Sequence, residues 1–281
     1  MTLVSLEQIE APPGDLAGNT AQILRRAKAA LSDGVDIAVF PELANSGYTT
    51  DPELVAKASQ PLDGPFISEL TALASRFGGL VATGYCEMDG DAFYNSVALV
   101  GAEGPILNYR KIHLFDAEHD MFSAGDSLPV VETEFGILGV CVCYDLRFVE
   151  VLRILSLKGA DIVLAPAAWV GGFDRHVPSR GLIPQAEAAI VQANLDQVAV
   201  VAVSQVSAVK RNGLRTLGGS VAVDAFGKIV AGPLSRRHSD VARATIDIDA
   251  GRAARERSLR IRPRADRRLD VYGLRYGKEI W

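Results

Sequence analysis

Long apolar runs and cysteines are scarce in this 281-residue sequence, and each scarcity excludes a class of protein. The longest stretch without a charged residue covers only 13 positions, Gln197 to Val209, whereas a membrane-spanning helix needs roughly 20 apolar residues. No positive charge precedes Arg25 and an acid stands at Glu7, which predicts no secretory signal peptide. Three cysteines, an odd number, do not make a disulfide framework. We therefore expect a reduced, cytoplasmic protein with no membrane partner.

The overall composition is that of a folded globular chain. Hydrophobic residues make up 48% and charged residues 22%, close to the average for soluble domains. No stretch rich in proline, glycine and serine divides the sequence, so we expect a single domain over residues 1–281.

The net charge of −5 is unevenly distributed. Residues 252–268 hold eight arginines against Glu256 and Asp266, a balance of +6, which leaves −11 for the other 264 residues. A basic segment can bind nucleic acid, but this one has no interleaved aromatic residues. We expect instead that the tail, residues 252–281, pairs with the acidic body of the protein or with a partner subunit.

Short apolar runs alternate with stretches of helical periodicity. Helices are predicted near residues 18–33, 66–77, 146–158 and 182–195, the first with an N-cap at Asn19 and Thr20 and a stop at Gly34. The predicted strands are Leu3–Leu6, Ile37–Phe40, Leu80–Tyr85, Ser96–Val100, Gly136–Cys143, Ile162–Ala165, Val198–Val203 and Ser220–Val223. This alternation predicts an α/β fold.

Two pairs of segments resemble each other at nearly one offset. VDIAVFPEL (35–43) matches ADIVLAPAA (160–168) at an offset of 125, and NSVALVGAEGPIL (95–107) matches GSVAVDAFGKIVA (219–231) at an offset of 124. Chance similarity between apolar strands is the alternative explanation. The shared offset favours an internal repeat, in which two sheets of similar design pack together.

The repeat also shows where the two halves differ. Glu42 follows Pro41 in the first half, whereas Ala167 follows Pro166 in the second. A carboxylate at the C-terminal end of a buried strand, in one half only, lies where ligands usually bind in α/β sheets. We therefore interpret Glu42 as a functional residue.

Glu42 is one of three reactive groups that follow apolar strands; the others are Lys111 and the thiols of Cys141 and Cys143. The two thiols point to the same side of a strand. Cys143 comes directly before the predicted helix, whose positive end would stabilise a thiolate. Cys141 lies between two valines and is expected in the core, as is Cys86. Cys143 is thus the candidate nucleophile.

A cysteine nucleophile needs a base and an oxyanion donor. Histidine is the usual base, but none of the four, His113, His119, His176 and His238, lies in a recognisable papain-type or caspase-type sequence. A buried carboxylate and a lysine ammonium can fill the same roles. Cys141-x-Cys143 with a nearby histidine is an alternative zinc site, although this is not common zinc-ligand spacing.

The segments FPELANSGY, NYRKIHLF, GVCVCYDLRF and PAAW, in this order, resemble the signatures of the nitrilase superfamily of carbon–nitrogen hydrolases. The resemblance extends over essentially the whole chain, to the RRLDVYG near its end. The family's Glu-Lys-Cys triad falls on Glu42, Lys111 and Cys143. The resemblance implies a four-layer α-β-β-α sandwich of two mixed sheets, no metal or organic cofactor, and a homodimer or larger homo-oligomer.

The implied reaction is hydrolysis of a small-molecule amide through a cysteine thioester. Glu42 is the expected base, and the Lys111 ammonium and the Tyr144 N–H are the expected oxyanion donors. Glu118 is the candidate for the family's second glutamate, although Asp116 and Asp120 are close in sequence. Tyr48 and Trp169, each just beyond a strand end, are expected to line the pocket together with Tyr144.

The residues after the nucleophile, Cys-Tyr-Asp-Leu-Arg-Phe, are similar to omega-amidase-like and small aliphatic amidase members, which favours an amide over a nitrile or an N-carbamoyl amine. QANLDQVAVVAVSQ (192–205) departs from the family pattern, with Gln192, Ala199 and Ser204 in place of Arg, Tyr and Asn. This leaves the acyl pocket and its substrate open. A non-enzymatic interaction module on the same fold is the alternative of another class.

Overall fold

The computed structural model describes residues 1–171, 182–207 and 215–280, and their strands form two six-stranded mixed sheets and a short hairpin. The first sheet has the order β12-β1-β2-β3-β4-β5. Its strands are β1 (Thr2–Gln8), β2 (Ile37–Val39), β3 (Leu80–Asp89), β4 (Ala92–Gly101), β5 (Gly104–Arg110) and β12 (Asp240–Ile246). The second sheet has the order β11-β10-β9-β8-β7-β6. Its strands are β6 (Val130–Thr133), β7 (Gly136–Val140), β8 (Ile162–Ala167), β9 (Ala199–Ser204), β10 (Val221–Val223) and β11 (Ile229–Ala231).

The two sheets share one plan of strand pairing. β1, β2 and β3 run parallel, β4 and β5 follow as antiparallel neighbours, and β12 pairs antiparallel with the outer side of β1. β7, β8 and β9 run parallel, β10 and β11 follow antiparallel, and β6 pairs antiparallel with β7. The matched segments of the sequence carry β2 and β8 at equivalent places. The predicted internal repeat is therefore confirmed.

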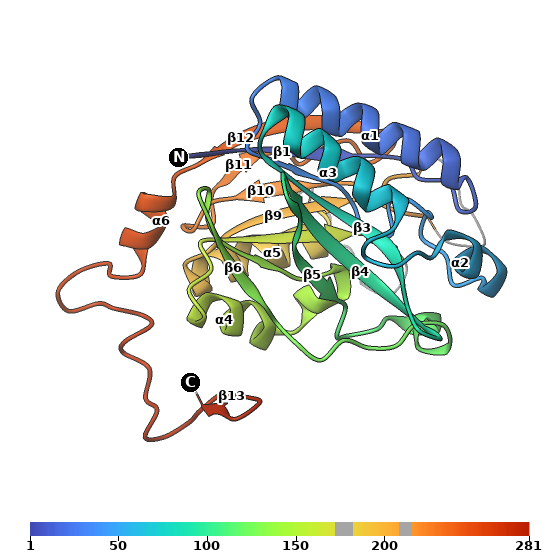
Figure 1. The fold of residues 1–281 in the computed structure, drawn as a ribbon. Coiled ribbons are helices and arrows are strands. Elements are labelled where there is room, and N and C mark those ends of the chain that lie inside the picture. Colours follow the sequence, from blue (N-terminus) through green and yellow to red (C-terminus); the bar gives the residue numbers. More distant parts are fainter. Residues whose placement is uncertain (172–181, 208–214, 281) are drawn as a thin grey trace.

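Helices cover the outer face of each sheet (Figure 1). In the figure, α1 and α3 lie over the first sheet and α4 and α5 lie against the second. The helices are α1 (Leu16–Ser32), α2 (Pro52–Ala58), α3 (Pro65–Phe77), α4 (Val149–Leu157), α5 (Pro184–Asp196) and α6 (Ile248–Ala254). The arrangement is the predicted four-layer α-β-β-α sandwich.

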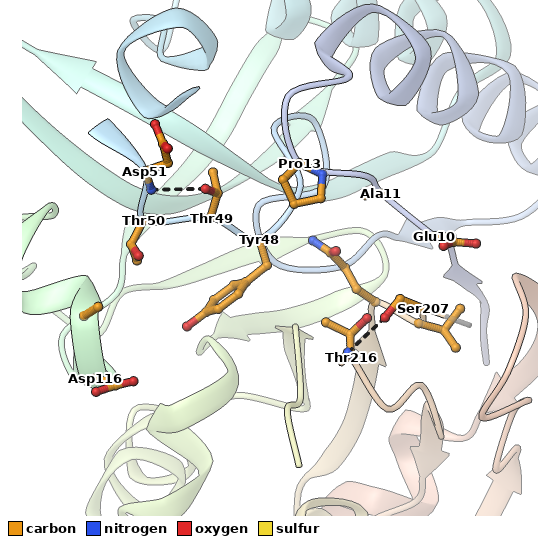
Figure 2. A pocket seen from close by; sticks show the side chains of 13 residues that line it. Glu10, Ala11, Pro13, Tyr48, Thr49, Thr50, Asp51, Asp116, Ser207 and Thr216 are labelled. Atoms are coloured by element: carbon orange, nitrogen blue, oxygen red, sulfur yellow. Dashed lines mark hydrogen bonds between the residues drawn. The ribbon is translucent and has the colours of Figure 1, made fainter. Parts of the chain in front are cut away.

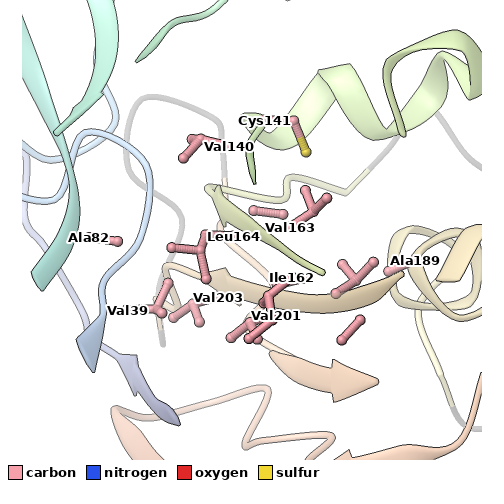
Figure 3. Close-up of a cluster of buried hydrophobic side chains, with 14 of the residues drawn as sticks. Val39, Ala82, Val140, Cys141, Ile162, Val163, Leu164, Ala189, Val201 and Val203 are labelled. Carbon is pink, nitrogen blue, oxygen red and sulfur yellow. The ribbon is translucent and has the colours of Figure 1, made fainter. Parts of the chain in front are cut away.

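The core between the sheets is made of small and branched apolar side chains. Figure 3 shows Val39 and Ala82 of the first sheet facing Leu164, Val201 and Val203 of the second. All five are fully buried. Strands buried on both faces read as continuous apolar runs, which is why the sequence located them. This packing brings the C-terminal ends of β2 and β8 together.

Several predicted boundaries were wrong: β3 continues to Asp89 instead of Tyr85, and β4 begins at Ala92 instead of Ser96. α1 begins at Leu16 with Asp15 as its N-cap, whose side chain accepts the N–H of Gly18; Asn19 lies inside the helix and donates to the Pro12 and Asn45 carbonyls. The strand predicted to reach Cys143 ends at Val140. The helix predicted from residue 146 begins at Val149, after a 3-10 turn, η2 (Cys143–Arg147).

The tail leaves the sandwich after α6 and runs as an extended segment to the hairpin of β13 (Arg275–Tyr276) and β14 (Glu279–Ile280) (Figure 1). Arg252 and Arg255 pair with the buried Asp161 at 2.8 and 2.7 Å. Six large apolar side chains of the tail are exposed: Leu259, Ile261, Leu269, Val271, Tyr272 and Ile280. Across the described parts of the chain, every helix is too short or too polar to cross a bilayer.

Candidate active site

Glu42 lies just beyond the end of β2 with its carboxylate fully buried. Its Oε1 accepts hydrogen bonds from Lys111 Nζ at 2.7 Å and from Asn95 Nδ2 at 2.8 Å. Its Oε2 accepts the backbone N–H of Ala168 at 2.8 Å, and its main-chain carbonyl accepts Gln205 Nε2 at 2.7 Å. Glu42 follows β2 and Asn95 lies in β4 of the first sheet, and Ala168 follows β8 of the second. Both sheets therefore hold this carboxylate.

Lys111 follows β5 and contacts a second buried carboxylate, Glu118. The Lys111 ammonium lies 2.8 Å from Glu118 Oε2 and 2.9 Å from Oε1. Burial opposes the charge on Lys111, but Glu42 and Glu118 outweigh this and raise its pKa above the ordinary value. The side chain therefore stays an ammonium ion between two carboxylates.

Glu118 belongs to a 3-10 turn, η1 (Asp116–Asp120), and is fixed from three directions. Besides Lys111, it accepts the Tyr48 hydroxyl on Oε1 at 2.9 Å and the Phe115 N–H on Oε2 at 3.0 Å. Burial raises the pKa of Glu118, and Lys111 opposes that shift. Burial and then the charge of Glu118 raise the pKa of Tyr48, so its phenol stays protonated and donates.

Cys143 begins the η2 turn with a left-handed backbone, φ +48°. It is partly exposed, whereas Cys86 and Cys141 are buried. Desolvation and then the charge of Glu42 raise the pKa of the Cys143 thiol, and Lys111 opposes them. The expected stabilisation of a thiolate by a helix end was wrong, because α4 begins only at Val149. The resting thiol is neutral and needs a base.

Asp145 holds the turn that carries Cys143. Its buried carboxylate accepts the Val142 N–H at 2.8 Å and the Tyr109 hydroxyl at 2.7 Å. The His113 N–H donates to the same carboxylate at 3.1 Å, and His113 Nδ1 lies 2.9 Å from it. Tyr109 belongs to β5 and His113 lies two residues past Lys111. Asp145 thus ties the nucleophile turn to the segment that carries the lysine.

Left-handed backbone at residues other than glycine gathers near this site. Among the described residues there are four, Leu43, Asp116, Cys143 and Gln197. Leu43 adjoins Glu42, Asp116 begins the turn of Glu118, and Cys143 is the candidate nucleophile. Such conformations are strained in L-residues and gather at functional sites.

The thiol of Cys143 lines a small pocket of about 20 Å³. Its other lining residues are Tyr48, Phe115, Tyr144, Leu146, Arg147, Ala168, Trp169, Val170, Gln185 and Ala188. The Tyr48 side chain also lines a larger cavity of about 330 Å³ (Figure 2), whose lining includes Glu10, Asp51, Asp116 and several hydroxyls. Tyr48 thus lies between the nucleophile pocket and the wider opening.

The structure brings all the predicted site residues together. Glu42, Lys111 and Glu118 are linked by hydrogen bonds, and the pKa of Cys143 responds to all three charges. Tyr48, Tyr144 and Trp169 line the pocket of Cys143. His113 binds Asp145, His119 lies in η1 and His238 contacts Ser235; His176 lies outside the described residues. No group of three potential metal ligands occurs in residues 1–171, 182–207 and 215–280.

Sequence reasoning missed Asn95, Asp145, Gln185 and Gln205. One of them carried a signal: Asn95 occupies the repeat position that Gly219 occupies in the second half, the same asymmetry that singled out Glu42. Asn95 Nδ2 lies 2.8 Å from Glu42 and 3.4 Å from Glu118. The others have no counterpart of this kind, because their roles depend on contacts between distant segments.

A comparison with protein families identifies the family of this chain. A family model described as carbon-nitrogen hydrolase matches residues 3–256. The chain therefore belongs to the carbon–nitrogen hydrolase family, and the resemblance and the enzyme class predicted from its motifs are confirmed.

Two relatives indicate the range of similarity. An (R)-stereoselective amidase of Pseudomonas sp is 33% identical over 254 residues, 90% of this chain and 87% of that protein. The protein called "Hydrolase in pqqF 5'region" of Pseudomonas protegens is 41% identical over 175 residues. That match spans 61% of this chain and 61% of the relative's length.

Two solved structures share the fold. The NitN amidase from Neterenkonia sp. AN1 superposes with a TM-score of 0.78 at 23% identity, over 96% of this chain and 98% of that one. Nit3 of Saccharomyces cerevisiae, a member of the nitrilase superfamily, gives a TM-score of 0.77 at 25% identity, over 94% and 96%. The fold class predicted from the sequence is confirmed.

Proposed function

We propose that this protein hydrolyses a small-molecule amide to a carboxylic acid and ammonia through a thioester on Cys143. The observation that carries the proposal is the buried Glu42–Lys111–Glu118 cluster, whose charges act on the thiol of Cys143. Relatives named amidase, omega-amidase and deaminated glutathione amidase support an amide as the substrate class.

The first step forms a tetrahedral intermediate. Because the thiol is neutral at rest, Glu42 takes its proton while Sγ attacks the amide carbon and the carbonyl π electrons move to oxygen. The Lys111 ammonium and the Tyr144 N–H stabilise the oxyanion. Lys111 is held in place before the reaction by two carboxylates, so little reorganisation accompanies the development of charge.

The second step breaks the C–N bond. The oxyanion collapses, Glu42 gives its proton to the leaving nitrogen, and ammonia departs to leave the acyl thioester. Glu42 then takes a proton from water, whose oxygen attacks the thioester, and Cys143 leaves and is reprotonated as the acid is released. One carboxyl group thus acts as base and acid in turn, and atoms and protons balance over the cycle.

Glu118 is proposed to orient the substrate amide by accepting one of its N–H bonds. Its two oxygens are fixed by Lys111, Tyr48 and Phe115 N–H, so the carboxylate has a defined direction. Such positioning contributes to the rate by holding the carbonyl carbon near the thiol.

Nitriles and N-carbamoyl amines are alternative substrates for the same three groups. The sequence after Cys143 and the names of the relatives favour the amide. An ammonia-release assay with aliphatic amides, nitriles and N-carbamoyl amines separates these classes. Release only from a nitrile or a carbamoyl amine would overturn the amide assignment.

Thiol alkylation tests the catalytic role of Cys143 against a non-enzymatic module. Iodoacetamide, followed by peptide mass spectrometry, should label Cys143 far faster than Cys86 or Cys141, and an amide substrate should slow that labelling. Cys143→Ala should abolish ammonia release, whereas the matched Cys141→Ala should keep it. Slow, equal labelling of the three thiols would favour the module.

The tail is proposed to pair with a second copy of the chain. Leu259 is 97% exposed and Val271 68% exposed, although the tail base is anchored by Arg252 and Arg255 on Asp161. Sedimentation equilibrium should therefore give a dimer or larger assembly, which Leu259→Glu with Val271→Glu should weaken. A monomeric wild-type chain would contradict the proposal.

A further inference from the structure

Two residues that line the Cys143 pocket each have a buried side-chain polar atom without a hydrogen-bond partner within the described residues. These atoms are the indole Nε1 of Trp169, a donor, and the carbonyl Oε1 of Gln185, an acceptor. Trp169 is 2% exposed and Gln185 is 6% exposed. Buried polar atoms are nearly always paired, and an unpaired one is costly. An unpaired donor and an unpaired acceptor, on two residues that line the same pocket, point to a ligand that satisfies both.

Neither side chain is loosely attached. Trp169 follows β8, and its main chain is held at both polar groups. The backbone N–H donates to Ser204 Oγ at 3.0 Å, and the backbone carbonyl accepts the Leu217 N–H at 2.7 Å. Gln185 lies in the first turn of α5 and its Nε2 donates to the Val170 carbonyl at 3.4 Å. With the amide nitrogen placed on the Val170 carbonyl, the Gln185 oxygen is left without a partner.

The rest of the lining is mostly uncharged; its one charged residue among those described is Arg147, which already has an interaction of its own. Most of the wall is aromatic or aliphatic, with Phe115, Leu146 and Val170 among its members, and Glu42 and Glu118 lie close behind it. A carboxylate would be repelled by these two and has no proton for Gln185. An ammonium group has no lone pair for Trp169. A hydroxyl group accepts from one and donates to the other.

The size of the pocket limits the rest of the ligand. Its volume of about 20 Å³ is near the roughly 10–15 Å³ that one water molecule requires. A hydroxyl group is about the size of one water molecule and therefore fits this space better than a larger donor–acceptor group such as a carboxamide.

We propose that Trp169 and Gln185 form a recognition pair for a hydroxyl group on a short acyl chain, so that the preferred substrates are hydroxy-substituted aliphatic amides. This inference rests on the amidase function proposed above and specifies its substrate class. The Trp169 N–H donates to the substrate hydroxyl oxygen, and the substrate hydroxyl donates to Gln185 Oε1.

The test compares 2- and 3-hydroxypropanamide with propanamide as substrates of the full-length protein. Wild-type kcat/KM should be about 10- to 100-fold higher for one hydroxy amide than for propanamide. Gln185→Leu and Trp169→Phe should each bring this ratio towards one. Because the readout is a ratio within one variant, partial loss of folded protein does not affect it.

Asn194→Leu is the matched control, because the Asn194 amide lies on the same helix but donates to the Phe226 carbonyl, away from the pocket. It should keep the wild-type ratio. Equal wild-type kcat/KM values for the three amides would overturn the inference and leave the amidase function standing. A preference that survives both pocket substitutions would also overturn it. Failure of all three amides to release ammonia or to protect Cys143 from alkylation would count against the proposed function itself.

Discussion

The two halves of the molecule share a strand plan and one structural carboxylate. Asp36 precedes β2 and accepts the N–H of Leu3 at 2.7 Å, and its repeat counterpart Asp161 precedes β8 and accepts the N–H of Ile137 at 2.9 Å. Each therefore joins the start of its strand to the neighbouring strand. Where the halves carry the same residue, that residue performs the same structural task.

The halves differ at the positions that build the site. Glu42 has Ala167 as its counterpart, and Asn95 has Gly219. The first half contributes Glu42, Asn95, Lys111 and Glu118, whereas the second contributes Cys143 and most of the pocket wall. The two halves therefore share one scaffold but supply different functional groups, and the site forms only where the two sheets meet.

The largest effect on activity is expected at Glu42, which has no acidic counterpart in the second half. Glu42→Gln keeps the size of the side chain but removes the base, and kcat/KM should fall by about 10²- to 10⁴-fold. The matched control is Asp36→Asn, which changes a carboxylate of the same half that has no catalytic role and should affect stability rather than kcat. Steady-state ammonia release measures both. Near-normal turnover of Glu42→Gln would mean that the carboxylate present only in the first half is not needed for catalysis.

The next effect is expected at Lys111. Lys111→Ala removes an oxyanion donor and should lower kcat by about 10²- to 10³-fold at least. It also leaves Glu42 and Glu118 buried without a cation, so the free energy of unfolding should fall by about 3–5 kcal/mol at neutral pH. Protonation of these carboxylates should restore part of that stability at lower pH. Chemical unfolding between pH 4 and pH 8, compared with wild type, measures the loss.

A smaller effect is expected at Asn95. Asn95→Ala removes the amide donor between Glu42 and Glu118, and kcat/KM should fall by about 10-fold, the value of one hydrogen bond to a charged group. Asn95→Asp should be worse, because it adds a third carboxylate to the cluster. If Asn95→Ala had wild-type kinetics, the asymmetry with Gly219 would carry no functional meaning.

The smallest effect is expected on stability, at Asp161 and its counterpart Asp36, which have the same structural role in the two halves. Burial opposes ionisation of Asp161, but Arg252, the Ile137 N–H and Arg255 outweigh it and lower its pKa. The stabilisation is present above the ordinary pKa of 3.8 and is lost as the pH falls through the lower native value. Asp161→Asn should therefore cost about 1–2 kcal/mol at pH 6 and less as the pH falls below 3.8. Asp36→Asn should cost less at pH 6, since its carboxylate has no arginine bound among the described residues. Equal losses would contradict this difference.

Local sequence patterns predicted the parts of the fold that local physics determines. Apolar runs located β2 and β8, and their shared spacing predicted two similar sheets. The strand β12 was missed because its half-exposed residues pair with β1 more than 230 positions away, and periodicity carries no record of such pairing. Glu42, Lys111 and Cys143 were predicted as site residues from strand ends and family motifs. Gln185 could not be found, because only the folding of α5 against β9 and η2 brings it to the pocket.

The left-handed backbone at Cys143 has a consequence for engineering. An L-residue in this conformation costs about 1–2 kcal/mol relative to glycine, so the nucleophile position lowers the stability of the whole domain. Selection for thermal stability alone would favour glycine at position 143 and yield a more stable protein without the thiol and without activity. Thermostabilised forms of this hydrolase should be sought away from η2, under assay conditions that demand turnover.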